Sequence, residues 1–294
     1  MNSESAVRNA IQGVIDLHRD RLDLLRAAKE PKVGFVSIQT PEEILLAAGV
    51  IPFRITGELE DSSDAGARLN NNYCSYILSC LGEGLDGIYD FADGVVFTNG
   101  CDMRKRLCEA WARDIPAIRS YFLDLPGDAS DLSKTYFARQ LRKLIAMLEQ
   151  RFGREVDDHA LRGAIDTCNR SRAAMQRLDR YLREGRTVLS GEQMIQVVKA
   201  ASTGLKEPFI ARMSVLLGAL EVEEQRAPRK RHRVMICGSY FDHKGIIDTI
   251  EETGAELVCA DISNGVKYFE GNIDPDGDPV AAIASYYLEK HTSA

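Results

Sequence analysis

The chain has 294 residues, of which 45% are hydrophobic and 28% are charged, and its formal net charge is −7 at pH 7. This composition is typical of a packed globular protein, and the length is enough for two domains, so disorder of the whole chain is excluded. The acidic balance argues against a nucleic-acid-binding protein, because the one strongly basic run, 226-RAPRKRHR-233, is typical of a solvated linker.

The sequence gives no sign of a membrane segment. No window reaches the roughly 18 uninterrupted apolar residues that a membrane span needs. Residues 1–13 lack the charged-then-apolar layout of a signal peptide. We therefore expect a cytoplasmic protein that binds neither a membrane nor a nucleic acid.

The chain contains seven cysteines. An odd number of cysteines in a reducing compartment excludes a complete disulfide framework, so we expect buried thiols, metal ligands or nucleophiles. No two of them have the C-x2-C to C-x4-C spacing of a zinc site, so any metal site must be assembled by the fold. They are Cys74, Cys80, Cys101, Cys108, Cys168, Cys237 and Cys259.

Residues 1–130 are predicted to form an α/β domain with a leading amphipathic helix at 6–29. Strand-type and helix-type patterns then alternate, which is the order that builds a parallel sheet with helices on both faces. A polar loop is expected at 60–72. The predicted strands are 33–38, 50–56, 94–98 and 117–125, and the predicted helices are 40–49, 73–87 and 102–114.

The start of the helix at 40–49 carries a capping pattern. Thr40 is the predicted N-cap, Pro41 the first helical residue, and Glu43 the residue whose side chain reaches back in a capping box. In the same way, Asp102 is predicted to cap the helix at 102–114.

Residues 131–228 are predicted to be a helical connector, because three segments have the 3.6-residue period of amphipathic helices. These segments are 135–153, 158–185 and 190–202. Residues 229–294 are predicted to form a second α/β domain with strands at 233–238 and 255–262 and helices at 244–254 and 279–291. Two strands are few for a sheet, so this domain is expected to be incomplete or to extend another sheet.

Cys101 follows a buried strand and begins a helix. In open parallel sheets, ligands bind outside the carboxyl ends of the strands, and the positive end of the following helix favours a thiolate. Cys74 also begins a helix after a loop and is the natural partner of Cys101, whereas Cys108 is expected to pack. The alternative for both Cys74 and Cys101 is a structural role as buried thiols.

Two other features leave alternatives open. Arg104, Lys105 and Arg106 form a run of cations that could receive an acidic partner or a phosphate, although a solvated helix face is more common. The loop 238-GSYFDHKG-245 follows a strand but is not a G-x-G-x-x-G motif, so it gives weak support to a nucleotide-binding protein with structural cysteines.

Several stretches taken together resemble one family, the 2-hydroxyacyl-CoA dehydratase and benzoyl-CoA reductase subunits. Each piece is short, but the pieces occur in order, and a C-S-Y motif followed by an N-G-C-D motif after a buried strand is fairly specific. The matching pieces are 40-TPEEILLAAGVIPFRITGE-58, 74-CSYILSCLG-82, 89-YDFADGVVFTNGCDMRKRL-107, 190-SGEQ-193 and 248-DTIEETGAELVCADISNGVKYF-269.

The resemblance implies a subunit of two Rossmann-like α/β domains with helical additions, which holds a [4Fe-4S] cluster through cysteine thiolates. In this family an ATP-hydrolysing activator protein delivers single electrons to the cluster, which passes them to a thioester substrate. A 2-hydroxyacyl-CoA then loses water through a ketyl radical, or an aromatic acyl-CoA ring is reduced. The resemblance thus implies a lyase that works with a homologous second subunit, and Cys74 and Cys101 match the first two cluster ligands.

The chain departs from the family pattern at the third ligand. The position that usually carries a cysteine falls on Ser263, and Cys259 lies four residues too early, inside a predicted strand. A serine oxygen is a poor substitute for a thiolate on iron. The chain also ends before the usual C-terminal elements of the family. A shortened, noncatalytic relative that acts as an assembly partner is therefore the competing hypothesis.

Ser37 and Glu58 flank the first matching stretch and lie at the ends of predicted strands. Both could face a substrate and take part in catalysis, and the alternative is that they are polar residues of ordinary connections between strands and helices.

Overall fold

The computed structural model describes residues 3–58, 63–69, 72–203, 205–222, 231–241 and 243–290. The chain divides into two compact units, one built from residues 26–166 and 273–292 and the other from residues 1–25 and 167–272. We call them the four-stranded unit and the two-stranded unit after their sheets. The division into a domain, a helical connector and a partial second domain stays a prediction.

Four parallel strands form the sheet of the four-stranded unit, in the order β2-β1-β3-β4. Val33 of β1 lies opposite Pro52 of β2 on one side and opposite Gly94 of β3 on the other. The first three strands are buried along their whole length, as parallel strands covered on both faces must be. The strands are β1 (Lys32–Phe35), β2 (Ile51–Arg54), β3 (Gly94–Thr98) and β4 (Arg119–Leu123).

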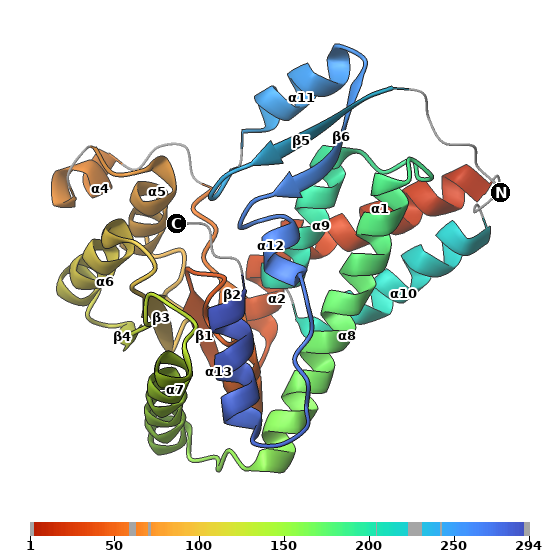
Figure 1. The fold of residues 1–294 in the computed structure, drawn as a ribbon. Helices are drawn as coiled ribbons and strands as arrows, with labels where there is room; N and C mark the ends of the chain where they lie inside the picture. Colours follow the sequence, from red (N-terminus) through yellow and green to blue (C-terminus); the bar gives the residue numbers. More distant parts are fainter. Residues whose placement is uncertain are drawn as a thin grey trace. The chain divides into compact units, whose positions relative to one another are not determined.

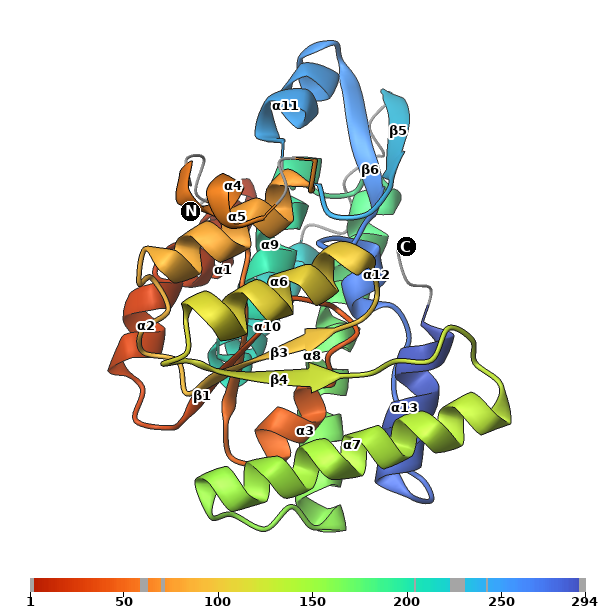
Figure 2. The same cartoon turned by 90° about the vertical axis from the view of Figure 1, so that its left-hand side faces the viewer.

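Helices cover both faces of this sheet (Figure 2). On one face, a hydrophobic core joins the strands to three helices, with Phe35, Val96 and Phe137 fully buried in it. On the other face, Trp111 packs on Phe97 of β3, with 5.7 Å between the ring centroids. The first face is covered by α3 (Glu42–Ala47), α7 (Asp131–Phe152) and α13 (Pro279–Glu289), and the second by α5 (Ser75–Leu85) and α6 (Asp102–Asp114).

The order of the strands places a topological switch between β1 and β3. From β1 the chain passes through α3 to β2 on one side, and it returns to β3 on the other side of β1. The crevice outside the carboxyl ends of strands at such a point is where open parallel sheets bind ligands. The segments that leave these two ends are therefore the first place to look for a site.

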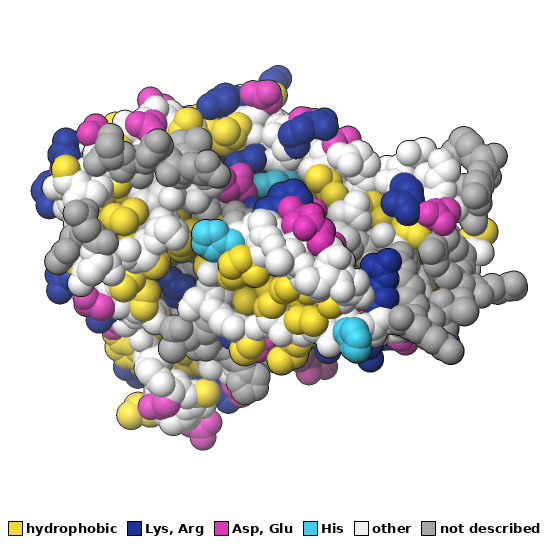
Figure 3. Space-filling model, turned by 90° about the horizontal axis from the view of Figure 1, so that it is seen from above, with side chains coloured by type: hydrophobic (Ala, Val, Ile, Leu, Met, Phe, Trp, Pro, Cys, Tyr) yellow, Lys and Arg dark blue, Asp and Glu magenta, His cyan; other side chains and the backbone are white. Residues whose placement is uncertain are grey.

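The two-stranded unit contains a small parallel sheet of β5 and β6, with α11 packed on β6 (Figure 1). Its apolar core includes Ile195, Ile247 and Leu257, all at most 2% exposed. The side chain of Met235 in β5 is 60% exposed, so one side of this strand is open to solvent. Figure 3 shows hydrophobic side chains gathered on the face that is seen from above. The elements are β5 (His232–Cys237), β6 (Ala255–Asp261), α9 (Gly191–Thr203), α11 (Lys244–Glu252) and α12 (Val266–Phe269).

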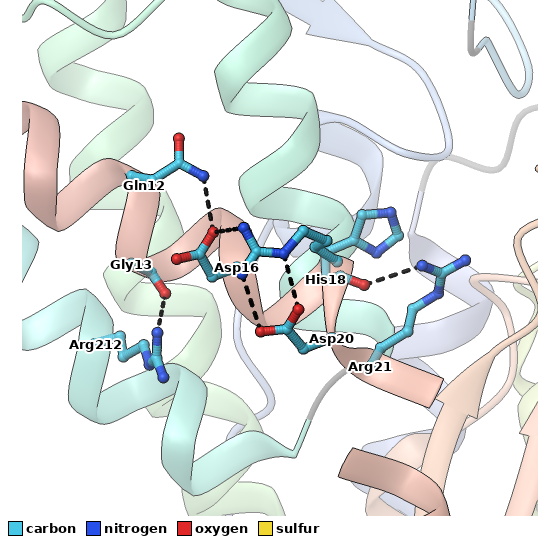
Figure 4. A network of polar contacts seen from close by, with 8 residues as sticks. Gln12, Gly13, Asp16, His18, Asp20, Arg21 and Arg212 are labelled. Atoms are coloured by element: carbon cyan, nitrogen blue, oxygen red, sulfur yellow. Dashed lines mark hydrogen bonds and ion pairs between the residues drawn. The ribbon is translucent and has the colours of Figure 1, made fainter. Parts of the chain in front are cut away.

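The N-terminal helix α1 (Ser3–Arg19) packs against α9 and α10 (Lys206–Val222) of the same unit. Arg212 of α10 donates to the carbonyl oxygen of Gly13, and Gln12 donates to Asp16 at 2.8 Å (Figure 4). Arg19 pairs with Asp16 at 2.7 Å and with Asp20 at 2.8 Å. The Arg212 contact ties the leading helix to α10, and the other three contacts are local to residues 12–20.

Several helices differ from the predictions, and the short helix α12 was not predicted. The leading helix is interrupted at Asp20, so that α1 is followed by a separate α2 (Arg21–Ala27). The expected polar loop at 60–72 contains the short helix α4 (Ser63–Arg68), and α10 was not predicted. The helix α10 has apolar residues on its exposed side as well, with Val215 67% and Val222 78% exposed, so its sequence lacks a clear amphipathic period. The remaining helix, α8 (Asp158–Arg183), was predicted within two residues.

Both capping predictions are wrong. Helix α3 begins at Glu42 with Pro41 as its N-cap, and no side chain caps it. Glu43 instead accepts a hydrogen bond of 2.8 Å from the hydroxyl of Tyr287, and burial of both side chains explains why it turns inward. Asp102 is the first residue of α6 rather than its cap, which is Cys101.

Parts of the predicted segments lie outside the described residues, among them 60–62 and 70–71 of the polar loop, 226–230 of the basic run and Asp242 of the loop 238–245. Among the residues that the structure describes, no helix is both long enough and apolar enough to cross a bilayer.

Candidate functional site

Cys74 and Cys101 lie at the starts of two helices, as predicted. They are the N-cap residues of α5 and α6, and neither side chain makes a capping hydrogen bond. Cys74 is exposed and Cys101 is half-buried. The backbone N–H of Cys74 lies 3.3 Å from Sδ of Met103 in the first turn of α6, so the two helix starts lie side by side.

Tyr76 fixes the start of α5, and with it Cys74, to the carboxyl end of the sheet. Its hydroxyl lies 2.8 Å from the carbonyl oxygen of Val36 and 2.9 Å from that of Ile55. These carbonyls follow β1 and β2, so one side chain joins two strand ends to the helix. Burial raises the pKa of Tyr76 far above its ordinary value, and the phenol therefore stays protonated as a donor.

Asn99 fixes the loop that delivers Cys101. Its side-chain oxygen accepts from the backbone N–H of Leu125 at 2.7 Å, and its Nδ2 donates to the carbonyl oxygen of Leu125 at 3.0 Å. Nδ2 also lies 2.5 Å from Oδ1 of Asp124. The loop after β3 is thus tied to the chain that leaves β4, which limits the positions that Cys101 can take.

Ser37 is completely buried just beyond the carboxyl end of β1. Its hydroxyl donates to Oε1 of Gln39 at 3.3 Å and accepts from Nη1 of Arg104 at 3.3 Å. Nη1 of Arg104 also lies 3.4 Å from Oε1 of Gln39. The Arg104 side chain reaches from the first turn of α6, so these residues connect the ends of β1 and β3 across the topological switch.

Gly100 lets this cluster form. A Cβ at position 100 would lie 2.6 Å from Nη1 of Arg104 and closer still to Oε1 of Gln39. Contacts of that length would require the ends of these two side chains to shift, so the glycine leaves room for their present positions.

Glu58 is half-buried after the end of β2, and its backbone N–H donates to Oε1 of Glu83 at 2.6 Å. The other oxygen of Glu83 accepts from the N–H of Gly57 at 3.1 Å and from the hydroxyl of Tyr89 at 2.5 Å. Glu83 belongs to α5, which also carries Cys74 at its start, and Gly57 has a positive φ of 60°. One buried carboxylate thus holds the turn that presents Glu58.

The other cysteines of the four-stranded unit are poor ligand candidates. Burial raises the pKa of Cys80 well above its ordinary value. Burial, followed by the charge of Glu109, raises the pKa of Cys108 to about 11. Both sulfurs therefore stay protonated near neutral pH, which agrees with the packing role predicted for Cys108.

Cys259 and Ser263 both lie in the two-stranded unit. Cys259 is 8% exposed inside β6, as its predicted place in a strand required, and burial raises its pKa. Ser263 is completely buried in the turn after β6, where its backbone N–H donates to the carbonyl oxygen of Ser239 at 2.7 Å. Cys237 is exposed at the end of β5, and a hydrogen bond to Asp261 raises its pKa.

The donor set fits part of an iron–sulfur site. Cys74 and Cys101 supply two accessible sulfurs that take no part in helix capping, and thiolates are the ligands that such clusters use. Within the described part of the chain, no group of three or more His, Cys, Asp or Glu side chains is arranged to hold a metal ion. The residues present therefore account for two ligands and not for a complete set.

Sequence reasoning did not assign a role to Tyr76, Glu83 or Gln39. Tyr76 lies two residues after Cys74, and the glycines near Glu83 mark a tightly packed helix, but neither signal reveals the strand ends that these side chains contact. The basic run at Arg104 is visible in the sequence, whereas the burial of its first member depends on the neighbourhood of β1 and β3.

Comparison with known proteins shows the family of the chain. Residues 37–294 match the model of the family described as 2-hydroxyglutaryl-CoA dehydratase, D-component. The chain is 26% identical over 269 residues to a benzoyl-CoA reductase subunit of Thauera aromatica, covering 89% of this chain and 69% of the relative.

Two further relatives are dehydratase subunits. The (R)-phenyllactyl-CoA dehydratase beta subunit of Clostridium sporogenes is 22% identical over 89% of this chain and 70% of its own length. The beta subunit of lactoyl-CoA dehydratase from Anaerotignum propionicum is 23% identical over 88% of this chain and 69% of its own length. Since the family model covers far more than half of the sequence, the chain belongs to the 2-hydroxyacyl-CoA dehydratase and benzoyl-CoA reductase subunit family.

Proposed function

We propose that this chain is the iron–sulfur subunit of a radical-type 2-hydroxyacyl-CoA dehydratase, a lyase that converts a 2-hydroxyacyl-CoA into an enoyl-CoA. The observation that supports it most is the placement of Cys74 and Cys101. Both residues begin helices that lie side by side at the carboxyl end of the sheet, and neither thiol makes a capping hydrogen bond. When bound, a [4Fe-4S] cluster supplies a one-electron carrier at this place.

The chain's own residues hold the site in three ways. Cys74 and Cys101 begin α5 and α6, and neither side chain makes a capping hydrogen bond, so both sulfurs can bind iron. Ser37 is fixed by Gln39 and Arg104, so its buried hydroxyl has a set position after β1, where we place it as a group that faces the substrate. Glu58 is presented by the turn that Glu83 holds, and its carboxylate is a suitable group to take or return a proton during loss of water.

Two partners follow from the same proposal. The enzyme is completed by a homologous second subunit, which is supported by the beta-subunit names of the phenyllactyl-CoA and lactoyl-CoA relatives. An ATP-dependent activator protein delivers the electron to the cluster. We also propose that the two sheets belong to Rossmann-like domains.

A second candidate is a noncatalytic relative that keeps the scaffold without a cluster. The observation in its favour is the buried Ser263 at the place where the family resemblance requires a third thiolate. A reductase subunit that acts on an aromatic acyl-CoA is the other alternative, and the similarity to the benzoyl-CoA reductase of Thauera aromatica favours it.

Iron and sulfide analysis after anaerobic purification tests the proposal. The wild-type chain should contain iron and acid-labile sulfide and absorb broadly near roughly 400 nm, as iron–sulfur proteins do. Cys74→Ser and Cys101→Ser should each lose the iron, and Cys108→Ser, the matched control on α6, should keep it. Equal iron in all three variants would refute the ligand assignment, and a colourless, iron-free wild-type protein would favour the noncatalytic relative.

A further inference from the structure

The cations Arg104, Lys105 and Arg106 are adjacent in the sequence but lie in different surroundings. Lys105 and Arg106 are exposed on α6, and Arg106 pairs with Glu109 at 2.8 Å. Arg104 is 8% exposed and points toward the ends of the central strands, where it meets Ser37 and Gln39. A solvated helix face accounts for two members of the run and not for the first.

Arg104 is a buried cation whose hydrogen-bond partners are neutral groups. Its Nη1 contacts one hydroxyl oxygen and one amide oxygen at 3.3 and 3.4 Å. Among the described residues, no carboxylate oxygen lies within 4.0 Å of its guanidinium. A guanidinium keeps its charge in a protein, and a buried charge without a counter-charge is strongly unfavourable. The side chains that contact Arg104 therefore do not supply a counter-charge for its guanidinium.

Further polar atoms near these strand ends also lack partners. The hydroxyl oxygens of Thr40 and Thr98 are buried without a hydrogen-bond partner among the described residues. Thr40 belongs to the turn after β1, where its N–H donates to the carbonyl oxygen of Ser37, and Thr98 is the last residue of β3. Gly100 and Cys101, which precede Arg104, are partly exposed.

We propose that Arg104, with Ser37 and Gln39, is a binding site for a carboxylate. One guanidinium balances one negative charge, which a carboxylate carries and a phosphate monoester exceeds. The two parallel N–H groups of a guanidinium match the two oxygens of a carboxylate, which makes the contact selective for a planar oxyanion.

The carboxylate can come from two sources. It can belong to the acyl group of a CoA thioester, which rests on the proposed function and would make Arg104 the residue that selects acyl groups bearing a second acid. It can also be a free dicarboxylate, which does not depend on the proposed function.

Isothermal titration of the full chain with succinyl-CoA, butyryl-CoA and sodium succinate tests the site and separates the sources. The two thioesters have acyl chains of equal carbon number, and one of them ends in a carboxylate. A charge-assisted bidentate contact corresponds to a preference of about tenfold or more for succinyl-CoA over butyryl-CoA. Three variants are compared. Arg104→Gln removes the charge, and Arg104→Lys keeps the charge without the two parallel N–H groups of the guanidinium. Lys105→Gln is the exposed control.

The wild-type and Lys105→Gln proteins should show the preference, Arg104→Lys should show a reduced one, and Arg104→Gln should show none. Equal affinity of the wild-type protein for the two thioesters overturns the inference, although it still agrees with the proposed acyl-CoA substrate. This comparison uses no variant, so it does not depend on the folding of one. A preference that survives in folded Arg104→Gln also overturns it. Binding of succinate alone, lost in Arg104→Gln, supports the carboxylate site and counts against the proposed acyl-CoA substrate. No binding of any of the three probes overturns the inference.

Discussion

The hydroxyl of Tyr76 lies 2.8 Å from the carbonyl oxygen of Val36, and the same hydroxyl is 2.9 Å from the carbonyl oxygen of Ile55. The hydroxyl of Tyr76 thus contacts one backbone oxygen after each of two neighbouring strands. Because Tyr76 is 8% exposed, water cannot readily replace it.

We expect Tyr76→Phe to lower the free energy of unfolding by about 1–2 kcal/mol, since it leaves buried acceptors without their donor. Urea unfolding followed by circular dichroism measures the change. The control is Tyr136→Phe, whose hydroxyl bonds Asp124 at 2.6 Å on a side chain that is 39% exposed. Equal losses in the two variants would show that the Tyr76 contacts contribute nothing beyond an ordinary surface hydrogen bond.

Gly100 is expected to tolerate no side chain. Gly100→Ala should destabilise the protein by about 1–3 kcal/mol, because the new Cβ would overlap Gln39 and Arg104 and force them to move. Gly127→Ala is the matched control, since nothing lies within 4 Å of a Cβ built there. The double variant Gly100→Ala/Gln39→Ala should recover part of the loss, and a double variant no more stable than the single one would contradict this explanation.

The thiols should differ in their reaction with iodoacetamide when the protein is folded and free of metal. Cys74 is exposed and should react readily, whereas Cys80 is completely buried with a strongly raised pKa and should react only after unfolding. The pKa of Cys108 is raised from 9.0 to about 11, so its thiolate fraction at pH 8 is about a hundredth of that of an ordinary thiol.

Timed labelling at pH 8 followed by peptide mass spectrometry gives these rates. The rate at Cys108 should keep rising as the pH increases beyond 9, because the raised pKa delays ionisation. A rate at Cys108 that levels off near pH 9 would show that burial does not hold this thiol in its protonated form.

Local patterns predict the strands of this fold well and the contacts between them poorly. The strand 94–98 was predicted with its observed bounds, because five consecutive buried residues between polar turns leave few alternatives. The starts of α5 and α6 at Cys74 and Cys101 were also predicted, since each follows a loop and precedes a regular apolar period. Such signals are carried by neighbouring residues.

The remaining features of the site depend on pairings across the chain. Thr40 was predicted as a helix cap from a local motif, but Pro41 holds that position in the structure, and the Glu43 carboxylate contacts Tyr287 from α13. The burial of Arg104 likewise follows from the placement of β3 beside β1, which no local period encodes. A sequence can therefore point to the candidate cysteines while leaving the side chains that surround them unassigned.

The placement of β1 between β2 and β3 has a consequence for the order of folding. β2 follows β1 after one short helix, whereas the contact of the Lys32 N–H with Asp93, beside β3, spans 61 residues. Closing the longer loop costs more chain entropy, so β1 and β2 should associate first and β3 should join later. Pulse-labelled hydrogen exchange should therefore find the amides of β2 protected before those of β3 and β4. The carboxyl ends of the central strands then come together late, and any metal centre held by Cys74 and Cys101 must be inserted into a nearly finished protein.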